Sequence, residues 1–366
     1  MRTQSTTMRE RHWAIGSLTG GSLTAGSLLV LCLVFLAFGG GVMTTRVNLF
    51  FINLLVVLAL QMFTGNSGVT SFGHISFMAI GAYAGALLTI PSGIKTYALP
   101  SLPSLIAGHQ LPFAAALVIA VGVTTVLAFL VGIPLSRLSG SAGAISTFAL
   151  LVVVNVVIAG ATGVTGGRRA LYGVPRVTTV ALTITFGLAA IVITRFFRDS
   201  PIGLRLRASR EDEVVAKAMG VHVTRVRLAS WTLSAALCAA SGVLYAHLLG
   251  AFSAQQFYLH ITILTLAMLI VGGMSTVSGA VIGCVVLTIA GEVLREWEAG
   301  AQLFGLSDIA IGLILLLVMY FRPGGLTGDL EVDERVAWAH RDRASITAVG
   351  LERPLVEQAA KTSDPD

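Results

Sequence analysis

Long apolar runs, separated by short polar or glycine-rich segments, occupy most of this 366-residue chain. A helix that crosses a bilayer needs about 17 to 25 mostly apolar residues. Such runs lie at 25–43, 48–64, 73–91, 112–134, 142–161, 178–197, 226–249, 258–272, 277–294 and 304–321. Because several runs are short or contain glycine, the pattern predicts an all-α, polytopic membrane protein with about eight to ten transmembrane helices, some of them broken or re-entrant.

The same runs predict the domain organisation. Residues 1–24 form a polar N-terminal segment, 25–322 a transmembrane domain with a cytoplasmic loop at 198–226, and 323–366 a polar C-terminal tail. The first run follows a basic segment and precedes no small-residue cleavage site, so a retained signal-anchor helix is expected. Most of the 24 Lys and Arg residues fall on one set of alternate loops and on the terminal segments, which places both termini in the cytoplasm.

Composition excludes several function classes. Charged residues make up 11% of the chain, against roughly 25% in soluble domains, which argues against a soluble enzyme or a nucleic-acid binder. The net charge of +6 is the expected product of membrane topology and indicates no nucleic acid. Between Glu10 and Asp199 there is no Asp or Glu, so the chain offers no obvious carboxylate relay for a proton- or sodium-coupled carrier.

Catalytic and metal chemistry find little support. The cysteines lie singly within apolar runs, and the histidines at 74, 247 and 260 lack metal-ligand spacing. A P-loop requires Gly immediately before Lys, whereas the lysines at 95, 217 and 361 follow Ile, Ala and Ala. Any ATP hydrolysis coupled to this chain must therefore occur on a separate subunit.

The longest basic segment, Ser200 to Gly220, is a predicted cytoplasmic feature. Pro201 and Gly203 favour a turn, and Gly220 suits the end of a helix. The single helix expected between them carries Leu204, Ala208, Val215 and Met219 on one face, with Arg205, Arg207, Arg210 and Glu213 around it. That apolar face could enter a groove of a partner. Alternatively, the helix is part of an ordinary basic loop and lies on lipid headgroups.

Small residues interrupt two apolar stretches at corresponding places in the two halves, at 65–74 and 272–279. Paired helix breaks are typical of a translocation path, although small residues also allow helices to pack closely. The candidate path residues are Asn53, Gln61, Asn66, Ser67, Ser71, Gly73, His74, Gly272, Gly273 and Ser278. Asn53, Gln61 and Asn155 could instead form ordinary hydrogen bonds between helices.

Four blocks resemble the LivM-type permeases of bacterial ATP-binding-cassette (ABC) importers for branched-chain amino acids. They are Gly65 to His74 followed by Gly81-Ala82-Tyr83, the Thr165-Gly166-Gly167 turn, Ser200 to Gly220 running into Leu233-Ser234-Ala235 and Gly242 to Ala246, and Gly272-Gly273 with Phe321 to Leu326. The resemblance covers about residues 45 to 328.

The resemblance implies an importer in the bacterial inner membrane. Its partners would be a related second permease, two ABC ATPase subunits that bind ATP and Mg, an extracytoplasmic solute-binding protein and membrane lipid, with no cofactor in this chain. It implies that the cytoplasmic segment contacts the ATPase. The residues concerned are Pro201, Gly203, Leu204, Arg205, Arg207, Ala208, Arg210, Glu213, Val215, Ala216, Met219 and Gly220. External docking would involve Thr165, Gly166, Gly167, Arg168 and Arg169.

Departures from the family pattern keep the solute open. Asn66 and Val69 stand where an aromatic residue and Gln are common, and Arg168-Arg169-Ala170 replace an acidic residue with Gly. Leu204 occupies a usually basic position. Related permeases carry urea, amides or small organic acids, and an ATP-independent channel or ion-coupled carrier is the alternative from another class. The two arginines could bind the solute-binding protein, attract an anionic or zwitterionic solute, or simply remain solvated.

Overall fold

The computed structural model describes residues 41–99, 101–103, 107–301, 305–322, 324–328 and 331. The predicted segment 1–24, most of the predicted span 25–43 and most of the tail 323–366 lie outside the described residues. Helices dominate the described part of the chain, and the two short strands, β1 (Leu171–Tyr172) and β2 (Ala251–Phe252), pair antiparallel with Leu171 opposite Phe252. The all-α prediction is therefore confirmed.

The helices follow one another along the chain with short connections. They are α2 (Gly41–Leu60) with the π-helical turn η1 (Gln61–Gly65), α3 (His74–Thr89), α4 (Ser92–Ala98), α6 (Phe113–Leu135), α7 (Gly140–Gly160), α8 (Thr162–Thr165), α9 (Val180–Asp199), α10 (Pro201–Glu211), α11 (Glu213–Ala218), α12 (Val223–Leu249), the 3-10 turn η2 (Ala254–Phe257), α13 (Leu259–Gly272), α14 (Val277–Ala301) and α15 (Leu306–Phe321).

Seven helical stretches within the described residues are long and apolar enough to cross a membrane. They are Met43–Gly65, Phe113–Leu135, Gly140–Gly160, Val180–Asp199, Val223–Leu249, Ala254–Gly272 and Val277–Glu298. Two shorter apolar helices, His74–Thr89 and Ile309–Phe321, match the remaining predicted spans after the first. The polytopic architecture is confirmed, and the side of the membrane on which the termini lie stays a prediction.

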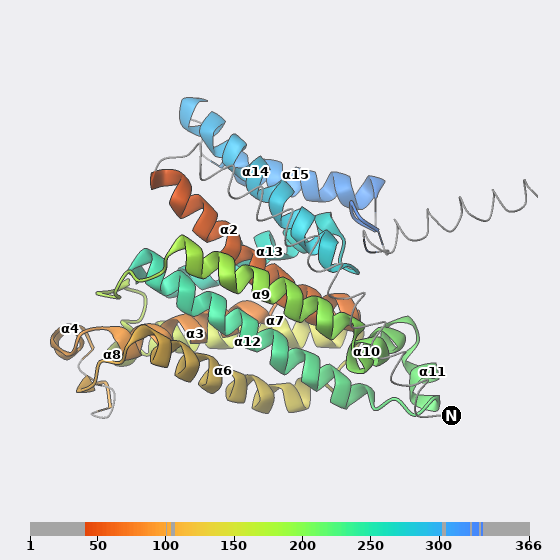
Figure 1. Cartoon of the computed structure of the whole chain (residues 1–366), viewed down its shortest axis with the longest axis horizontal. Helices are drawn as coiled ribbons and strands as arrows, with labels where there is room; N and C mark the ends of the chain where they lie inside the picture. Colours follow the sequence, from red (N-terminus) through yellow and green to blue (C-terminus); the bar gives the residue numbers. More distant parts are fainter. Residues whose placement is uncertain are drawn as a thin grey trace, which may run out of the picture.

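Helix α12 is the central packing element, because it contacts α3, α6 and α2, while α2 also packs along α9 and α14. Figure 1 shows α6 along one side of the bundle and α14 and α15 along the opposite side. The short helices α10 and α11 lie together at one end, here called the α10 end, and α4 and α8 lie at the other, the α4 end (Figure 1).

Close packing of α3 against α12 depends on glycine. A methyl group at Gly242 would overlap the backbone carbonyl of Met78, and one at Gly81 would overlap that of Ala239. These contacts give a physical reason for the small residues in both helices, because backbones in a membrane bundle associate through close van der Waals packing.

Gly242→Ala is expected to destabilise the bundle, because the added methyl group meets backbone atoms that cannot rotate away. Overpacking of this kind costs typically about 1–3 kcal/mol. The midpoint of thermal unfolding of the purified protein measures the effect. Gly122→Ala in α6 is the matched control, since nothing lies within 4 Å of the added methyl group. Equal midpoints for the two variants would contradict the packing role of Gly242.

Candidate functional site

The polar segment between α9 and α12 forms two helices, which corrects the prediction of one helix across residues 201–220. Asp212 interrupts the helix with an extended backbone (φ −151°), and its carboxylate accepts hydrogen bonds from the backbone nitrogens of Val214 and Val215, capping α11. Pro201 begins α10 after the Ser200 cap and does not form the predicted turn. Gly220 follows α11 at φ +83°, as expected for a residue that ends a helix.

The four apolar residues of the predicted contact face are exposed at the α10 end, and we call them the coupling surface. Leu204, Val215 and Met219 are 53%, 57% and 80% exposed, and Ala208 is exposed as well. The opposite side of α10 is buried, where Leu206 packs with Met62, Phe197 and Val226. The segment is thus anchored to the bundle and still presents large apolar side chains outward.

Polar contacts fix α11 relative to the bundle. The carboxylate of Glu213 lies 2.7 Å from Lys217 Nζ and 3.2 Å from Arg227 Nη2. The hydrogen bond from Lys217, assisted by Arg227, lowers the pKa of Glu213 despite its partial burial. Arg227 also donates to the backbone oxygen of Leu138, at 2.9 Å. Movement of α11 would therefore reach α12 and the loop between α6 and α7.

The two predicted helix breaks lie together, next to α10. A methyl group at Gly65 would overlap the backbone oxygen of Met274, so the backbones of the two breaks touch. Arg210 of α10 donates from Nη1 to the Gly65 carbonyl (2.8 Å) and to the Ser275 hydroxyl (3.2 Å). One guanidinium group from the cytoplasmic segment thus binds both breaks.

Polar side chains of the first break mostly bond to their own segment. The Asn66 amide donates to the Met62 carbonyl (2.9 Å), and Ser67 Oγ accepts from the backbone nitrogen of Val69 (3.2 Å). Ser71 Oγ accepts from the backbone nitrogen of Gly73 (3.3 Å). Such contacts compensate for backbone groups that the helix leaves free.

His74 and Gln61 lie deeper at the same junction. The His74 ring nitrogens lie 2.7 Å from Ser71 Oγ and 2.8 Å from Ser234 Oγ, so the ring connects the break to α12. Gln61 is fully buried, and within the described residues its amide has no hydrogen-bond partner. The structure places these candidate path residues in a packed helix junction, and their role in solute passage stays a prediction.

The chain after α15 packs into the second break. The backbone nitrogens of Leu326 and Thr327 donate to Val271 O (2.9 Å) and Gly272 O (3.1 Å). Thr327 Oγ1 also lies 2.9 Å from Thr276 Oγ1. We call residues 324–328 and 331 the C-terminal clamp. These residues fall within the predicted tail 323–366, yet they are part of the helical bundle.

Glu331 completes the clamp from a fully buried position. Its carboxylate accepts hydrogen bonds from the backbone nitrogens of Val277 (2.7 Å) and Ser278 (3.1 Å) at the start of α14, and from Ser278 Oγ (2.6 Å). Arg195 Nη1 and Arg198 Nε of α9 lie 3.2 and 3.3 Å from the same carboxylate. Ser278 therefore binds the clamp, and Glu331 joins α9 to α14.

The predicted docking residues lie at the α4 end. Thr165 Oγ1 donates to the carbonyls of Ile158 (2.6 Å) and Ala161 (2.9 Å), and Gly166 and Gly167 both adopt positive φ, which accounts for the Thr-Gly-Gly sequence. Arg168 and Arg169 are exposed and line a hollow of about 560 Å³ together with Tyr97 and Tyr172. Asn155 donates to Ala254 O (3.0 Å), the interhelical contact weighed as its alternative role.

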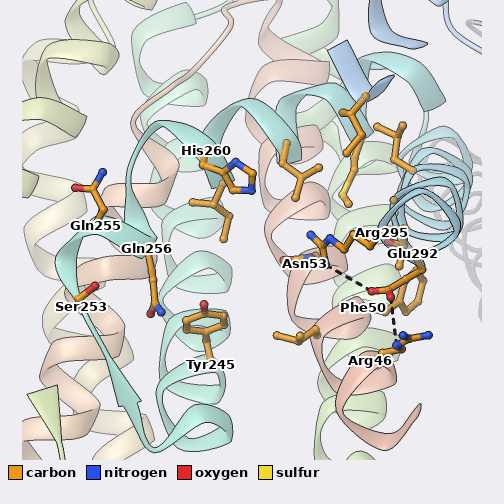
Figure 2. A pocket seen from close by; sticks show the side chains of 18 residues that line it. Arg46, Phe50, Asn53, Tyr245, Ser253, Gln255, Gln256, His260, Glu292 and Arg295 are labelled. Atoms are coloured by element: carbon orange, nitrogen blue, oxygen red, sulfur yellow. Dashed lines mark ion pairs between the residues drawn. The ribbon is translucent and has the colours of Figure 1, made fainter. Parts of the chain in front are cut away.

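An outer cavity of about 450 Å³ opens between α2, α13, α14 and the end of α12. Figure 2 shows Tyr245, Ser253, Gln255, Gln256 and His260 on one side of it, facing Arg46, Phe50, Asn53, Glu292 and Arg295 on the other. Asn53 is the predicted path residue that lies here, away from the two breaks.

Sequence reasoning missed the long-range ion pairs. It treated Arg195 and Arg198 as cytoplasmic loop charges and Arg46 as an isolated external charge, whereas Arg46 pairs with Glu292 at 3.2 Å and with Glu296 at 3.1 Å. Opposite charges near the ends of two predicted helices were the available signal for Arg46. No comparable signal identified Glu331, because more than a hundred residues separate it from its arginines.

The fold and the paired helix breaks define a multi-pass membrane protein. Residues 42–319 match the family described as "Branched-chain amino acid transport system / permease component", and the chain belongs to this family. The predicted function is thereby confirmed at that level: the chain is the permease component of an ABC transport system for branched-chain amino acids, and a transport subunit instead of an enzyme.

Several curated relatives share this description. The high-affinity branched-chain amino acid transport system permease protein LivM of Salmonella typhimurium is 27% identical over 346 residues, covering 84% of this chain and 76% of the relative. The probable LivM of Methanocaldococcus jannaschii is 25% identical over 74% of this chain and 89% of the relative. LivH of Escherichia coli is 32% identical over 41% of this chain and 47% of the relative. No solved structure matches the chain.

Proposed function

We propose that the chain acts in an ATP-driven importer together with a related second permease, two ABC ATPase subunits and an extracytoplasmic solute-binding protein. In this arrangement the α10 end and both termini face the cytoplasm of a bacterial inner membrane, and the α4 end faces outward. The ATPase subunits bind ATP and Mg, and this chain passes a branched-chain or other small amino acid. Similarity to both LivM and LivH relatives supports a pairing of two related permeases.

The arrangement around Arg210 carries the proposal. The coupling surface and Arg210 belong to the same pair of short helices, and Arg210 binds Gly65 and Ser275 of the two breaks. Closure of ATPase subunits against the coupling surface would move this guanidinium group, and the two breaks would follow. Coupling in proteins travels through such contiguous packed and hydrogen-bonded contacts.

Reconstitution into proteoliposomes tests the proposed function. The complete assembly should accumulate L-leucine only when ATP and loaded binding protein are both supplied. Robust leucine flux by the purified chain alone, without ATP, would instead establish the channel or carrier alternative. Replacing leucine with urea or a short amide in the same assay tests the other solutes weighed for this family.

Replacing both Arg168 and Arg169 with Ala is expected to weaken docking of the binding protein at the α4 end. The exposed pair can bind carboxylates on the partner, but each exposed ion pair is worth only about 0–1 kcal/mol. We therefore expect a rise of a few-fold in the concentration of loaded binding protein needed for half-maximal uptake. The effect should fade as salt increases, because the Debye length falls to about 8 Å at 0.15 M.

Uptake at saturating binding protein distinguishes docking from a solute-attracting role. If docking is the role, saturation restores uptake by the double variant to nearly the wild-type rate. An unchanged concentration dependence at low salt would show that both arginines are merely solvated. Arg176→Ala is the matched control, since this exposed arginine lies at the same end and its Nε donates to the Leu249 carbonyl.

A further inference from the structure

The outer cavity combines a charged wall with an apolar wall. Its charged wall consists of Arg46 of α2 and Glu292 and Arg295 of α14. Its apolar wall includes Leu264, Met268 and Leu287 from α13 and α14. The volume of about 450 Å³ lies within the range of about 300–1,000 Å³ that is usual for small-molecule sites.

The charged wall holds a carboxylate between two guanidinium groups. Arg46 Nε lies 3.2 Å from Glu292 Oε2, and Arg295 Nη1 lies 3.6 Å from Glu292 Oε1. The second contact is longer than a hydrogen bond, and the Arg295 side chain is 58% exposed, so its guanidinium group can accept another carboxylate without breaking a close pair. Both signs of charge are thus available within one turn of α14.

This pairing matches the chemistry of a zwitterion. An α-amino acid carries an ammonium and a carboxylate group on one carbon atom, and neither group can enter a membrane protein without a partner at acceptable cost. A neighbouring Glu and Arg supply these partners without adding net charge. The apolar wall then provides the environment that an aliphatic side chain requires.

The location of the cavity is suited to solute entry. Gln255 of η2 lines the outer cavity and also lines a separate hollow of about 510 Å³ that includes Arg168 and Asn155. The outer cavity therefore lies beside the predicted docking turn. Gln256 and His260 face its charged wall from the opposite side, as Figure 2 shows, and add polar groups for the water that accompanies a charged solute.

We propose that the outer cavity is a binding site for a zwitterionic α-amino acid with a branched aliphatic side chain. The ammonium group binds Glu292, the carboxylate binds Arg295, and the side chain packs against Leu264 and Met268. The proposal rests on the import direction proposed above, which makes this cavity the first site reached from the binding protein.

Glu292→Gln and Glu296→Gln in the complete reconstituted importer form the test. Both substitutions remove one carboxylate from α14 that contacts Arg46, but Glu292 lines the outer cavity and Glu296 does not. The measured quantity is L-leucine imported per ATP hydrolysed. Glu292→Gln should lower it by about tenfold, the usual effect of losing a hydrogen bond to a charged group. Glu296→Gln should stay near the wild-type value.

A binding measurement without the binding protein separates solute recognition from assembly. L-Leucine should raise the thermal-unfolding midpoint of the purified permease complex and of Glu296→Gln, and should not raise that of Glu292→Gln. 4-Methylpentanoate, which lacks the ammonium group, and isopentylamine, which lacks the carboxylate, should leave all midpoints unchanged. If Glu292→Gln does not assemble, Arg295→Gln replaces it in both measurements.

The outcomes distinguish this site from the proposed function. If the wild-type assembly fails to import leucine with ATP, the importer proposal fails. If it imports leucine and Glu292→Gln behaves like Glu296→Gln, only the assignment of the outer cavity is wrong. A midpoint shift produced equally by leucine and by 4-methylpentanoate would also overturn the assignment, since it would show an apolar site with no requirement for the ammonium group.

Discussion

Val215→Asp is expected to separate the chain from its ATPase partner. Val215 is 57% exposed on α11. In the proposed assembly it is buried in the ATPase groove, where an unpaired carboxylate is costly. Central interface residues typically contribute about 2 kcal/mol or more, so we expect the association to weaken about thirtyfold or more. Copurification of the ATPase and stimulated ATP hydrolysis both measure the loss.

Val177→Asp provides the matched control for this prediction. Val177 is 42% exposed, and it lies in the connection between β1 and α9, toward the α4 end. The same change of side chain there should leave the ATPase bound. If Val215→Asp copurified with its ATPase as fully as Val177→Asp does, the coupling surface would have to be assigned elsewhere.

The spans of this protein could be predicted because each depends on a local run of apolar residues. The predicted runs at 112–134 and 142–161 correspond closely to α6 and α7. In the polar segment, local reasoning found the exposed apolar residues but missed the break at Asp212. An Asp that caps a following helix and an Asp within a helix look alike until the backbone hydrogen bonds are known.

The candidate site shows where sequence reasoning ends. Glycine and small residues predicted that two helices break, and both breaks exist. That Gly65 meets Met274, and that Arg210 reaches both, depends on packing between segments about 65 to 210 residues apart. No periodicity within a single helix contains that information. The same limit applies to Asn53, which lies in the outer cavity, apart from the other candidate path residues.

A continuous set of contacts supports the proposed coupling route. Arg210 joins α10 to both breaks, and the C-terminal clamp holds the second break through Thr327 and Glu331. Glu331 in turn binds Arg195 and Arg198, near the end of α9 that leads into α10. Movement at the coupling surface would therefore reach α14 by two routes, and α14 carries Glu292 of the outer cavity.

Removing the Glu331 carboxylate should produce the largest loss of stability. Glu331 is 1% exposed, and it forms ion pairs with two arginines that are themselves almost fully buried. Truncating one partner of a buried ion pair leaves the remaining charge poorly compensated, which costs about 3–5 kcal/mol. Glu331→Ala also leaves the first backbone nitrogens of α14 without their acceptor.

The thermal-unfolding midpoint of the purified chain measures this loss, and Glu211→Ala is its matched control. Glu211 is exposed at the end of α10, so its removal should change stability by no more than about 0.5 kcal/mol. Glu331→Gln should fall between the two, because the amide oxygen can still accept from α14 while the charge is lost. If Glu331→Ala unfolded at the same temperature as Glu211→Ala, the clamp would contribute nothing to the fold. A steep loss for Glu331→Ala with partial rescue by Gln would show that the clamp acts through both its charge and its hydrogen bonds to α14.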